Sequence, residues 1–247
     1  MKAIIIARDR VTYTRACVLG LAATPGIDEI HIVDHGSTYE PMTAYLGGIG
    51  GDRTFTNGGQ ARVHVHWRGN DHPRSLWTNG TLDVIVRHDE RFLVTDCDIE
   101  PPADPGWLEH LGALLDLNPR AVKAGCGLRT DDLPDEYEHA DRVRMWEAGY
   151  QGFGTLQRDS ASGLAWFNAS VDTTLALYRG LEPFNLDPAV RSADVRFMAR
   201  HLSWYVDSAN LAEDERYYRA HALNGVSHWL DPDGYQSAAH LPEGVQP

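Results

Sequence analysis

FLVTDCDIE, residues 92–100, joins an apolar run to two aspartates that stand two positions apart. The apolar start is typical of a strand that is buried in a sheet. If the segment stays extended, Asp96 and Asp98 project to the same side, because side chains alternate along a strand. Two neighbouring carboxylates repel each other unless a positive charge lies between them, and their hard oxygen atoms suit Mg²⁺ or Mn²⁺. The stretch therefore predicts a strand whose end carries a candidate divalent-metal site.

Strand and helix patterns alternate on both sides of this stretch. KAIIIA (2–7) and EIHIVD (29–34) are typical of strands buried on both faces, and a helical pattern follows each of them. RFLVTD (91–96) is a further strand, and DPGWLEHLGALLDLN (104–118) is an amphipathic helix with a proline near its start. The candidate caps of the first two helices are Thr12 or Thr14 and Ser37 or Thr38. This alternation predicts an α/β fold with right-handed crossovers and a mainly parallel sheet flanked by helices.

Two segments between these elements bear on possible ligand sites. GGIGGDRTFTNGGQ (47–60) is expected to be a flexible connection, because it neither follows a strand nor has the spacing of a phosphate-binding loop. RVHVHW (62–67) alternates, so its valines share one face of a strand while His64 and His66 share the other. No further residue at metal-ligand spacing accompanies the two histidines. We therefore interpret the pair as a half-exposed strand face rather than as a metal site.

The second half of the chain is less regular. Strand patterns occupy 121–128, 164–170 and 171–179, and helical patterns occupy 136–150 and 194–206. No repeat, low-complexity tract or linker divides the sequence, so we expect a single domain over 1–247.

Composition and charge exclude several classes of protein. The 247 residues are 43% apolar, which is typical of a folded protein, and no run approaches the roughly 20 apolar residues that cross a bilayer. The formal net charge of −13 argues against a general nucleic-acid binder, which needs clustered Lys and Arg. Cys17, Cys97 and Cys126 lack metal-ligand spacing and argue against a disulfide framework or a zinc site. The short apolar run near the first residue is not followed by a cleavage region, so we expect a cytoplasmic protein.

TDCDI (95–99), together with IVDHGSTYEP (32–41), resembles the glycosyltransferases of the GT-A fold. These enzymes use nucleotide sugars and carry an Asp-x-Asp motif at the end of a strand in a Rossmann-like mixed sheet. Three further segments resemble a small bacterial and phage subgroup of family-2-like transferases: GLRTDDLPDEY (127–137), VDTTLALYR (171–179) and ARHLSWY (199–205). The chain departs from that subgroup at RSADVRF (191–197), where a segment with Pro and Tyr is expected. The resemblance runs through most of residues 2–230.

The resemblance implies a metal-dependent hexosyltransferase. It implies a nucleotide-binding half at 1–100, an acceptor-binding half at 101–247, a donor that is a UDP-sugar, and Mn²⁺ or Mg²⁺ as the ion. The acceptor hydroxyl is unidentified and belongs to a glycan or a small molecule. Asp34 is expected at the nucleoside, and Asp96 and Asp98 at the metal, with Asp96 also close to the donor. Candidates for further donor contacts are Arg8, Arg15, Arg74, Asn70 and Trp77.

An inverting transfer also needs a base that takes the proton of the acceptor hydroxyl. Asp172 is one candidate, because it opens an apolar strand pattern in which loss of solvent raises a carboxyl pKa. Its alternative role is that of a turn aspartate that caps backbone amides. His201 is the other candidate, and on its expected helix it is a base, a metal ligand or a packing residue.

Three alternatives to this function remain open. One is glycosylation of hydroxymethylated bases in DNA, against which the acidic balance argues and which a groove of Lys and Arg would favour. A nucleotidyltransferase is disfavoured, because no glycine-rich phosphate loop follows the strand at 2–7. The third is a non-catalytic carbohydrate- or nucleotide-binding protein, since a fold does not determine function.

Overall fold

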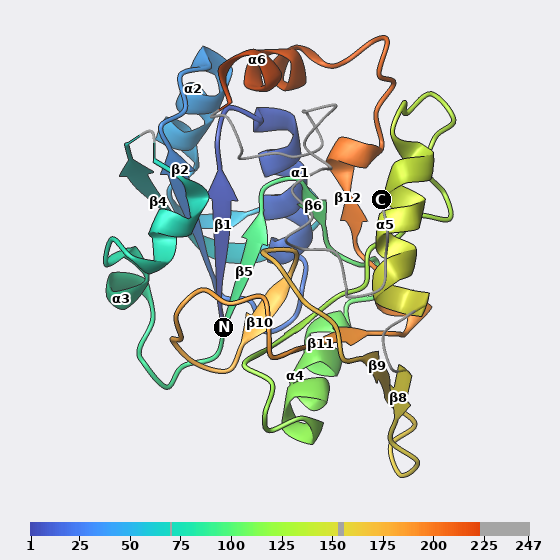
Figure 1. Ribbon diagram of the computed structural model, residues 1–247. Coiled ribbons are helices and arrows are strands. Elements are labelled where there is room, and N and C mark those ends of the chain that lie inside the picture. The colour runs from blue at the N-terminus through green and yellow to red at the C-terminus, as the bar shows by residue number, and fades with distance from the viewer. Residues whose placement is uncertain (70, 153–155, 223–247) are drawn as a thin grey trace.

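The computed structural model describes residues 1–69, 71–152 and 156–222, in which a mixed sheet is flanked by helices (Figure 1). In chain order the larger helices are α1 (Val11–Ala22), α2 (Glu40–Ile49), α3 (Thr81–Ile85), α4 (Trp107–Leu117), α5 (Ala140–Gly152) and α6 (Glu213–His221). The strands of the first half are β1 (Lys2–Ala7), β2 (Glu29–His35), β3 (Gly51–Thr54), β4 (Gln60–Arg68), β5 (Phe92–Asp96) and β6 (Ile99–Glu100). Those of the second half are β7 (Lys123–Gly125), β8 (Leu156–Arg158), β9 (Ala165–Phe167), β10 (Ala176–Tyr178), β11 (Ala189–Ser192) and β12 (Arg200–His201).

The main sheet has the strand order β3-β4-β2-β1-β5-β10-β7-β11-β9-β8 over the described residues. Strands β4, β2, β1 and β5 are parallel neighbours, and β7 pairs in parallel with β11. Strand β10 is inserted antiparallel between β5 and β7, so these two flanking strands run in the same direction. This confirms the predicted α/β class with a mixed, mainly parallel sheet flanked by helices. Strands from both expected halves, 1–100 and 101–247, pair in this main sheet, and the roles of the two halves stay a prediction.

Each face of the sheet has its own apolar layer. Ile5, Ile30 and Ile32 are fully buried against helices α1, α2 and α4, whose apolar faces complete one cluster. On the opposite face, Ile4 and Val94 pack against α3 and the short 3₁₀ turn Pro73–Trp77. Because β1 and β5 are covered on both sides, residues 3–7 and 92–94 are apolar without alternation.

The strand register places the polar ends of three strands at one edge. Ala7 lies opposite Asp34 on β2, and Ile6 lies opposite Asp96 on β5. The carboxyl ends of β1, β2 and β5 therefore meet at the same edge of the sheet. None of the described helices has the length and apolarity to cross a bilayer.

Four local predictions are wrong. At the two helix starts, carboxylates distant in the sequence accept from the backbone, Asp214 from the amide of Thr12 and Asp9 from that of Tyr39. Thr12 and Thr14 lie inside α1, which begins after Arg10 without a side-chain cap. Helix α2 begins after Tyr39, and no side-chain cap forms from Ser37 or Thr38.

The stretch 47–60 contains the end of α2 and strand β3, which pairs with β4, so it is not a flexible connection. The expected helix at 194–206 is instead two 3₁₀ turns separated by β12. Two backbone amides of this segment bond to carbonyls distant in the sequence: Ala199 donates to Gly127, and Leu202 donates to Asp98.

Candidate functional site

A cavity of about 350 Å³ opens at the edge of the sheet where β1, β2 and β5 end. Its walls come from the strand ends, from residues 71–77 after β4, from residues 170–174 before β10, and from α5. Ligands of open parallel sheets bind beyond the carboxyl ends of the strands, and a cavity of a few hundred Å³ accommodates a small molecule. This cavity is therefore the candidate active site, and the aspartates of TDCDI lie in its wall.

Asp98 is a buried carboxylate that is held by positive and polar partners. Arg10 donates to its Oδ2 at 2.7 Å, and Ser203 donates its hydroxyl to the same oxygen. Burial opposes ionisation of Asp98, but the charge that His201 carries when it is protonated, the Arg10 guanidinium and the Ser203 hydroxyl outweigh burial and keep the pKa of Asp98 below its usual range. Asp98 is therefore ionised at neutral pH.

Arg10 also pairs with Glu215 of α6, so one guanidinium balances two carboxylates. Its Nε lies 2.9 Å from Glu215 Oε2 and its Nη2 donates to Oε1 at 3.1 Å. The guanidinium carbon also lies 3.7 Å from the centre of the Tyr218 ring, which adds a cation–π contact. This network joins α6 to the strand ends and fixes the position of Asp98.

Asp96 has the opposite electrostatic environment. Thr173 donates its hydroxyl to Asp96 Oδ2 at 2.7 Å, and no cation-bearing side chain bonds to this carboxylate among the described contacts. Burial raises its pKa well above the usual value, and the nearby charges of Asp98 and Asp172 raise it further. A divalent cation at this carboxylate would offset the repulsion and lower its pKa again.

His201 lies beside this pair, on β12 rather than on the expected helix. Strand β12 pairs with β6 so that His201 stands opposite Ile99, and the imidazole stacks on Trp204 with ring centres 4.5 Å apart. Its Nδ1 is buried, has no hydrogen-bond partner in the described residues and lies 3.6 Å from Asp98 Oδ2. Burial lowers the pKa of His201, so its ring is neutral and its free nitrogen is a candidate metal ligand.

The donor atoms at this place fit a divalent ion in their chemistry. Asp96 faces the cavity with excess negative charge around it, and His201 Nδ1 is a buried nitrogen without a donor. Carboxylates with one imidazole suit Mn²⁺ or Mg²⁺. In the described residues the ligand atoms of Asp96, Asp98 and His201 are not all within 4.8 Å of one another. These side chains must therefore move closer together to hold an ion jointly.

The other predicted residues fall into two groups. Arg8, Arg74, Trp77 and Asp172 line the cavity together with Asp96, Asp98 and His201. Asp172 lies before β10 rather than in a strand, and it is exposed, so the expected burial of this carboxylate is wrong.

Asp34 and Arg15 are not among the residues that line the cavity. Asp34 is buried and accepts hydrogen bonds from the amide and hydroxyl of Ser37, so its carboxylate turns back onto its own loop. Arg15 stacks over the ring of Tyr45 on α2, 4.9 Å from its centre. The contacts of Asp34 with the nucleoside and of Arg15 with the phosphates, which the resemblance implies, stay predictions. Asn70 lies outside the described residues.

Several residues of the cavity wall were not expected from the sequence. Arg10 is the third residue after β1, and the rule that polar residues at strand ends meet at one edge would have indicated it. His35 ends β2, and its Nδ1 lies 2.9 Å from Asp71 Oδ1. The buried pair of Glu147 and Arg191, with 3.0 Å between its charged atoms, had no sequence signal because it joins α5 to β11.

Comparisons with known proteins give structural likenesses only. No protein-family model matches the chain, and no curated protein matches its sequence. The mannosyltransferase PcManGT from Pyrobaculum calidifontis, solved in complex with GDP-Man and Mn²⁺, has 13% identity and a TM-score of 0.48, over 96% of this chain and 73% of that chain. TarS from S. aureus has 13% identity and a TM-score of 0.36, over 56% of this chain and only 24% of that chain. At these values neither likeness identifies the activity.

Proposed function

We propose that the protein is a metal-dependent glycosyltransferase that binds a nucleotide-sugar donor in the cavity at the carboxyl ends of β1, β2 and β5. One observation carries this proposal. Asp96 and Asp98 of the Asp-x-Asp motif lie together in the wall of that cavity. Asp98 is ionised, and Asp96 lies near the negative charges of Asp98 and Asp172. Such a pair, in a cavity that also contains arginines, suits the joint binding of a divalent cation and a diphosphate.

The donor diphosphate is placed between the carboxylates and two arginines. Asp96, Asp98 and His201 would hold Mn²⁺ or Mg²⁺, which when bound neutralises charge that develops on the leaving diphosphate. Arg8 and Arg74 line the same cavity and supply further positive charge, and Arg8 Nε lies 3.4 Å from Asp9 Oδ2. Arg10 does not take part directly, because Asp98 and Glu215 already occupy its guanidinium.

Asp172 is the proposed catalytic base. It lines the cavity and is exposed, so an acceptor hydroxyl can reach its carboxylate. The acceptor oxygen attacks the anomeric carbon, the bond to the nucleoside diphosphate breaks, and the hydroxyl proton passes to Asp172. His201 is less suited to this role, because its ring is stacked on Trp204 and its free nitrogen faces Asp98.

The donor base and the acceptor are finer parts of the proposal. UDP is the first nucleotide to test, and the acceptor is a hydroxyl of a glycan or a small molecule. Modified DNA is less favoured, because the exposed Arg129 and Arg200 are already paired with Asp131 and Asp132. A cytoplasmic location stays a prediction.

The experiment is calorimetric titration of the purified protein with UDP and, separately, with GDP. Each titration is done with Mn²⁺ and with a chelator, and repeated with Asp98→Asn and with the surface control Asp131→Asn. We expect nucleotide binding that needs Mn²⁺, that Asp98→Asn abolishes and that Asp131→Asn leaves unchanged. Binding that ignores both the metal and Asp98, or no binding of either nucleotide, overturns the proposed donor site. Binding without hydrolysis of any donor sugar supports the non-catalytic alternative.

A further inference from the structure

A second group of metal-ligand side chains lies on β2 and β4, away from the carboxyl ends that form the cavity. Glu29 and His31 are two positions apart on β2, so their side chains share one face, and His64 stands directly opposite His31 on β4. Their ligand atoms all lie within 4.8 Å of one another, which no other set of His, Cys, Asp or Glu in the described residues achieves. His31 lies four residues before the end of β2, roughly 13 Å along the strand from the cavity edge.

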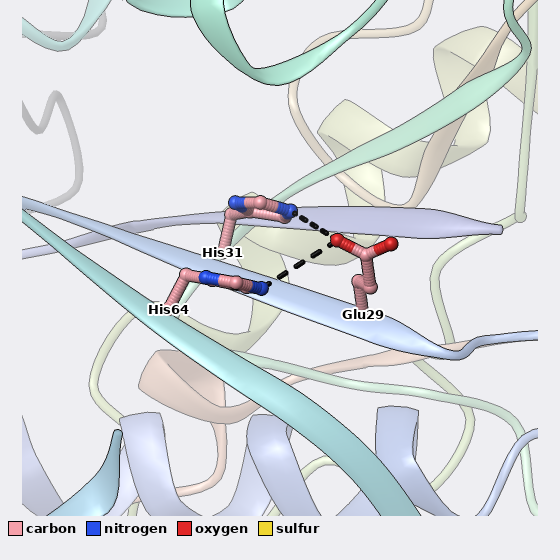
Figure 2. A group of neighbouring side chains, drawn as sticks. All are labelled: Glu29, His31 and His64. Carbon is pink, nitrogen blue, oxygen red and sulfur yellow. Dashed lines mark ion pairs between the residues drawn. The ribbon is translucent and has the colours of Figure 1, made fainter. Parts of the chain in front are cut away.

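The arrangement brings three acceptor atoms to one point. Figure 2 shows Nε2 of His31 and Nε2 of His64 both directed at the same carboxylate oxygen of Glu29, each at 3.5 Å. Both nitrogens are buried and have no hydrogen-bond partner in the part of the chain that the structure describes. A separation of 3.5 Å is too long for a good hydrogen bond. Ligands at about 2.1 Å from a tetrahedral Zn²⁺ lie roughly 3.4 Å apart, which matches the observed spacing.

A neighbouring histidine orients the central ligand. His31 Nδ1 lies 3.0 Å from His66 Nε2, so one of the two rings donates to the other. When His31 donates from Nδ1, its Nε2 carries a lone pair that points toward Glu29. Metal-bound histidines commonly donate their second ring nitrogen in this way.

Packing alone does not account for these contacts. The rings of His31 and His64 are stacked with centres 4.5 Å apart and 9° between their planes, as on many strand faces. Stacking does not need a carboxylate beside the two Nε2 atoms, and it gives neither atom a hydrogen-bond partner. The nearby cationic side chains are paired with other carboxylates rather than with Glu29. Lys2 pairs with Glu90 at 3.1 Å, and Arg62 pairs with Asp52 at 2.8 Å.

We propose that Glu29, His31 and His64 bind a zinc ion that joins β2 to β4, with His66 orienting His31. Imidazole and carboxylate ligands suit Zn²⁺, and three protein ligands leave one position for water. The nearly parallel rings must tilt toward each other on binding, which the broad torsion of histidine side chains allows. The ion would hold together the two strands that lead to His35 and to residues 71–77 of the cavity wall. This proposal does not depend on the proposed glycosyltransferase function.

The first test is the zinc content of the untagged full chain, since a polyhistidine tag would itself bind zinc. The protein is equilibrated with Zn²⁺, dialysed, and measured by inductively coupled plasma mass spectrometry beside four variants. His64→Ala and Glu29→Gln remove ligands that are only partly buried, with 38% of each side chain exposed. His88→Ala removes an exposed histidine as a matched control, and Asp98→Asn alters the cavity site.

We expect about one zinc ion per wild-type, His88→Ala and Asp98→Asn chain, and roughly tenfold or greater weakening of zinc binding in His64→Ala and Glu29→Gln. Cobalt should give the visible absorption of a tetrahedral site in the wild type and not in the two ligand variants. Zinc should also raise the melting temperature of the wild type but not of His64→Ala, while the two melt alike in chelator. Wild-type protein without zinc, equal zinc in His64→Ala, or zinc lost only in Asp98→Asn overturns the proposal.

Discussion

Replacing Arg10 by methionine should destabilise the protein strongly. The Arg10 side chain is 7% exposed and bonds to two carboxylates, Asp98 at 5% and Glu215 at 0% exposure. Methionine retains much of the apolar stem that packs here but removes the positive charge. The carboxylates then keep only weaker compensation, from the Ser203 hydroxyl and from Arg219 at 2.9 Å.

The size of the destabilisation in Arg10→Met follows from the buried carboxylate that is left without a counter-charge. Removing one partner of a buried ion pair costs about 3–5 kcal/mol, because the other partner stays buried and unpaired. Arg219 continues to balance Glu215, so one carboxylate rather than two loses its counter-charge. We therefore expect a loss of about 3–5 kcal/mol in the free energy of unfolding at neutral pH, a large part of the total stability of an ordinary domain.

The loss should depend on pH in a defined direction. The pKa of Asp98 is below its ordinary value of 3.8 in the folded protein, so its interactions stabilise the fold above that value and are lost as pH falls through the folded pKa. Without Arg10 the buried carboxyl takes up a proton at higher pH. The difference between Arg10→Met and the wild type should therefore shrink as the pH is lowered from about 7 to about 5.

Urea unfolding at these two pH values measures both effects. Arg144→Met is the control, because Arg144 pairs with Asp141 at the surface, where 95% of the aspartate side chain is exposed. That change should cost no more than about 0.5 kcal/mol at either pH. A loss below about 1 kcal/mol for Arg10→Met, or an equal loss at both pH values, would refute the assigned role of Arg10.

Three further predictions concern the cavity and the core. Asp172→Asn should lower kcat of sugar transfer by about 10²–10⁴ while calorimetry shows unchanged donor binding; equal loss in Asp131→Asn would contradict a specific role. Binding of Mn²⁺ with nucleotide should weaken as pH falls, because the raised pKa of Asp96 lets a proton compete with the ion, and pH-independent calorimetric affinity would exclude Asp96 as a ligand. Trp107→Ala should lower the free energy of unfolding by about 3–5 kcal/mol in urea, because Trp107 is fully buried in α4; a loss under 1 kcal/mol would contradict its place in the core.

Several strands of the first half could be predicted because burial on both faces requires a run of apolar residues in the sequence. The apolar runs of β1, β2 and β5 needed no knowledge of their neighbours. The stretch 194–206 could not be predicted in this way. Its apolar residues are spaced as on a helix, but Phe197 and Trp204 are buried through backbone contacts with residues 98 and 127, which a local pattern does not contain.

In the candidate site, too, the residues that could be predicted are those marked by local sequence features. The place of Asp96 and Asp98 in the cavity wall could be predicted because a strand end and a spacing of two are local features. Asp34 stands at an equally suitable strand end, yet its carboxylate bonds to the amide and hydroxyl of Ser37, and this local competition is not visible in a motif. Arg10 and Glu215 are 205 residues apart in the sequence, so only the folded structure reveals their pairing.

The histidines of β2 and β4 show how one register sets two faces at once. Pairing Ile30 with Val63 and Ile32 with Val65 directs these apolar residues into the core, and it necessarily places His31 beside His64 on the opposite face. A shift of one residue would reverse both faces, so the hydrophobic core itself holds the histidines together. Burying His31 with an unpaired nitrogen is unfavourable, because a buried polar atom without a partner costs about 1–3 kcal/mol. A bound cation removes that penalty at His31 and His64 together and at the same time neutralises Glu29, whereas water can donate to only two of these three acceptors.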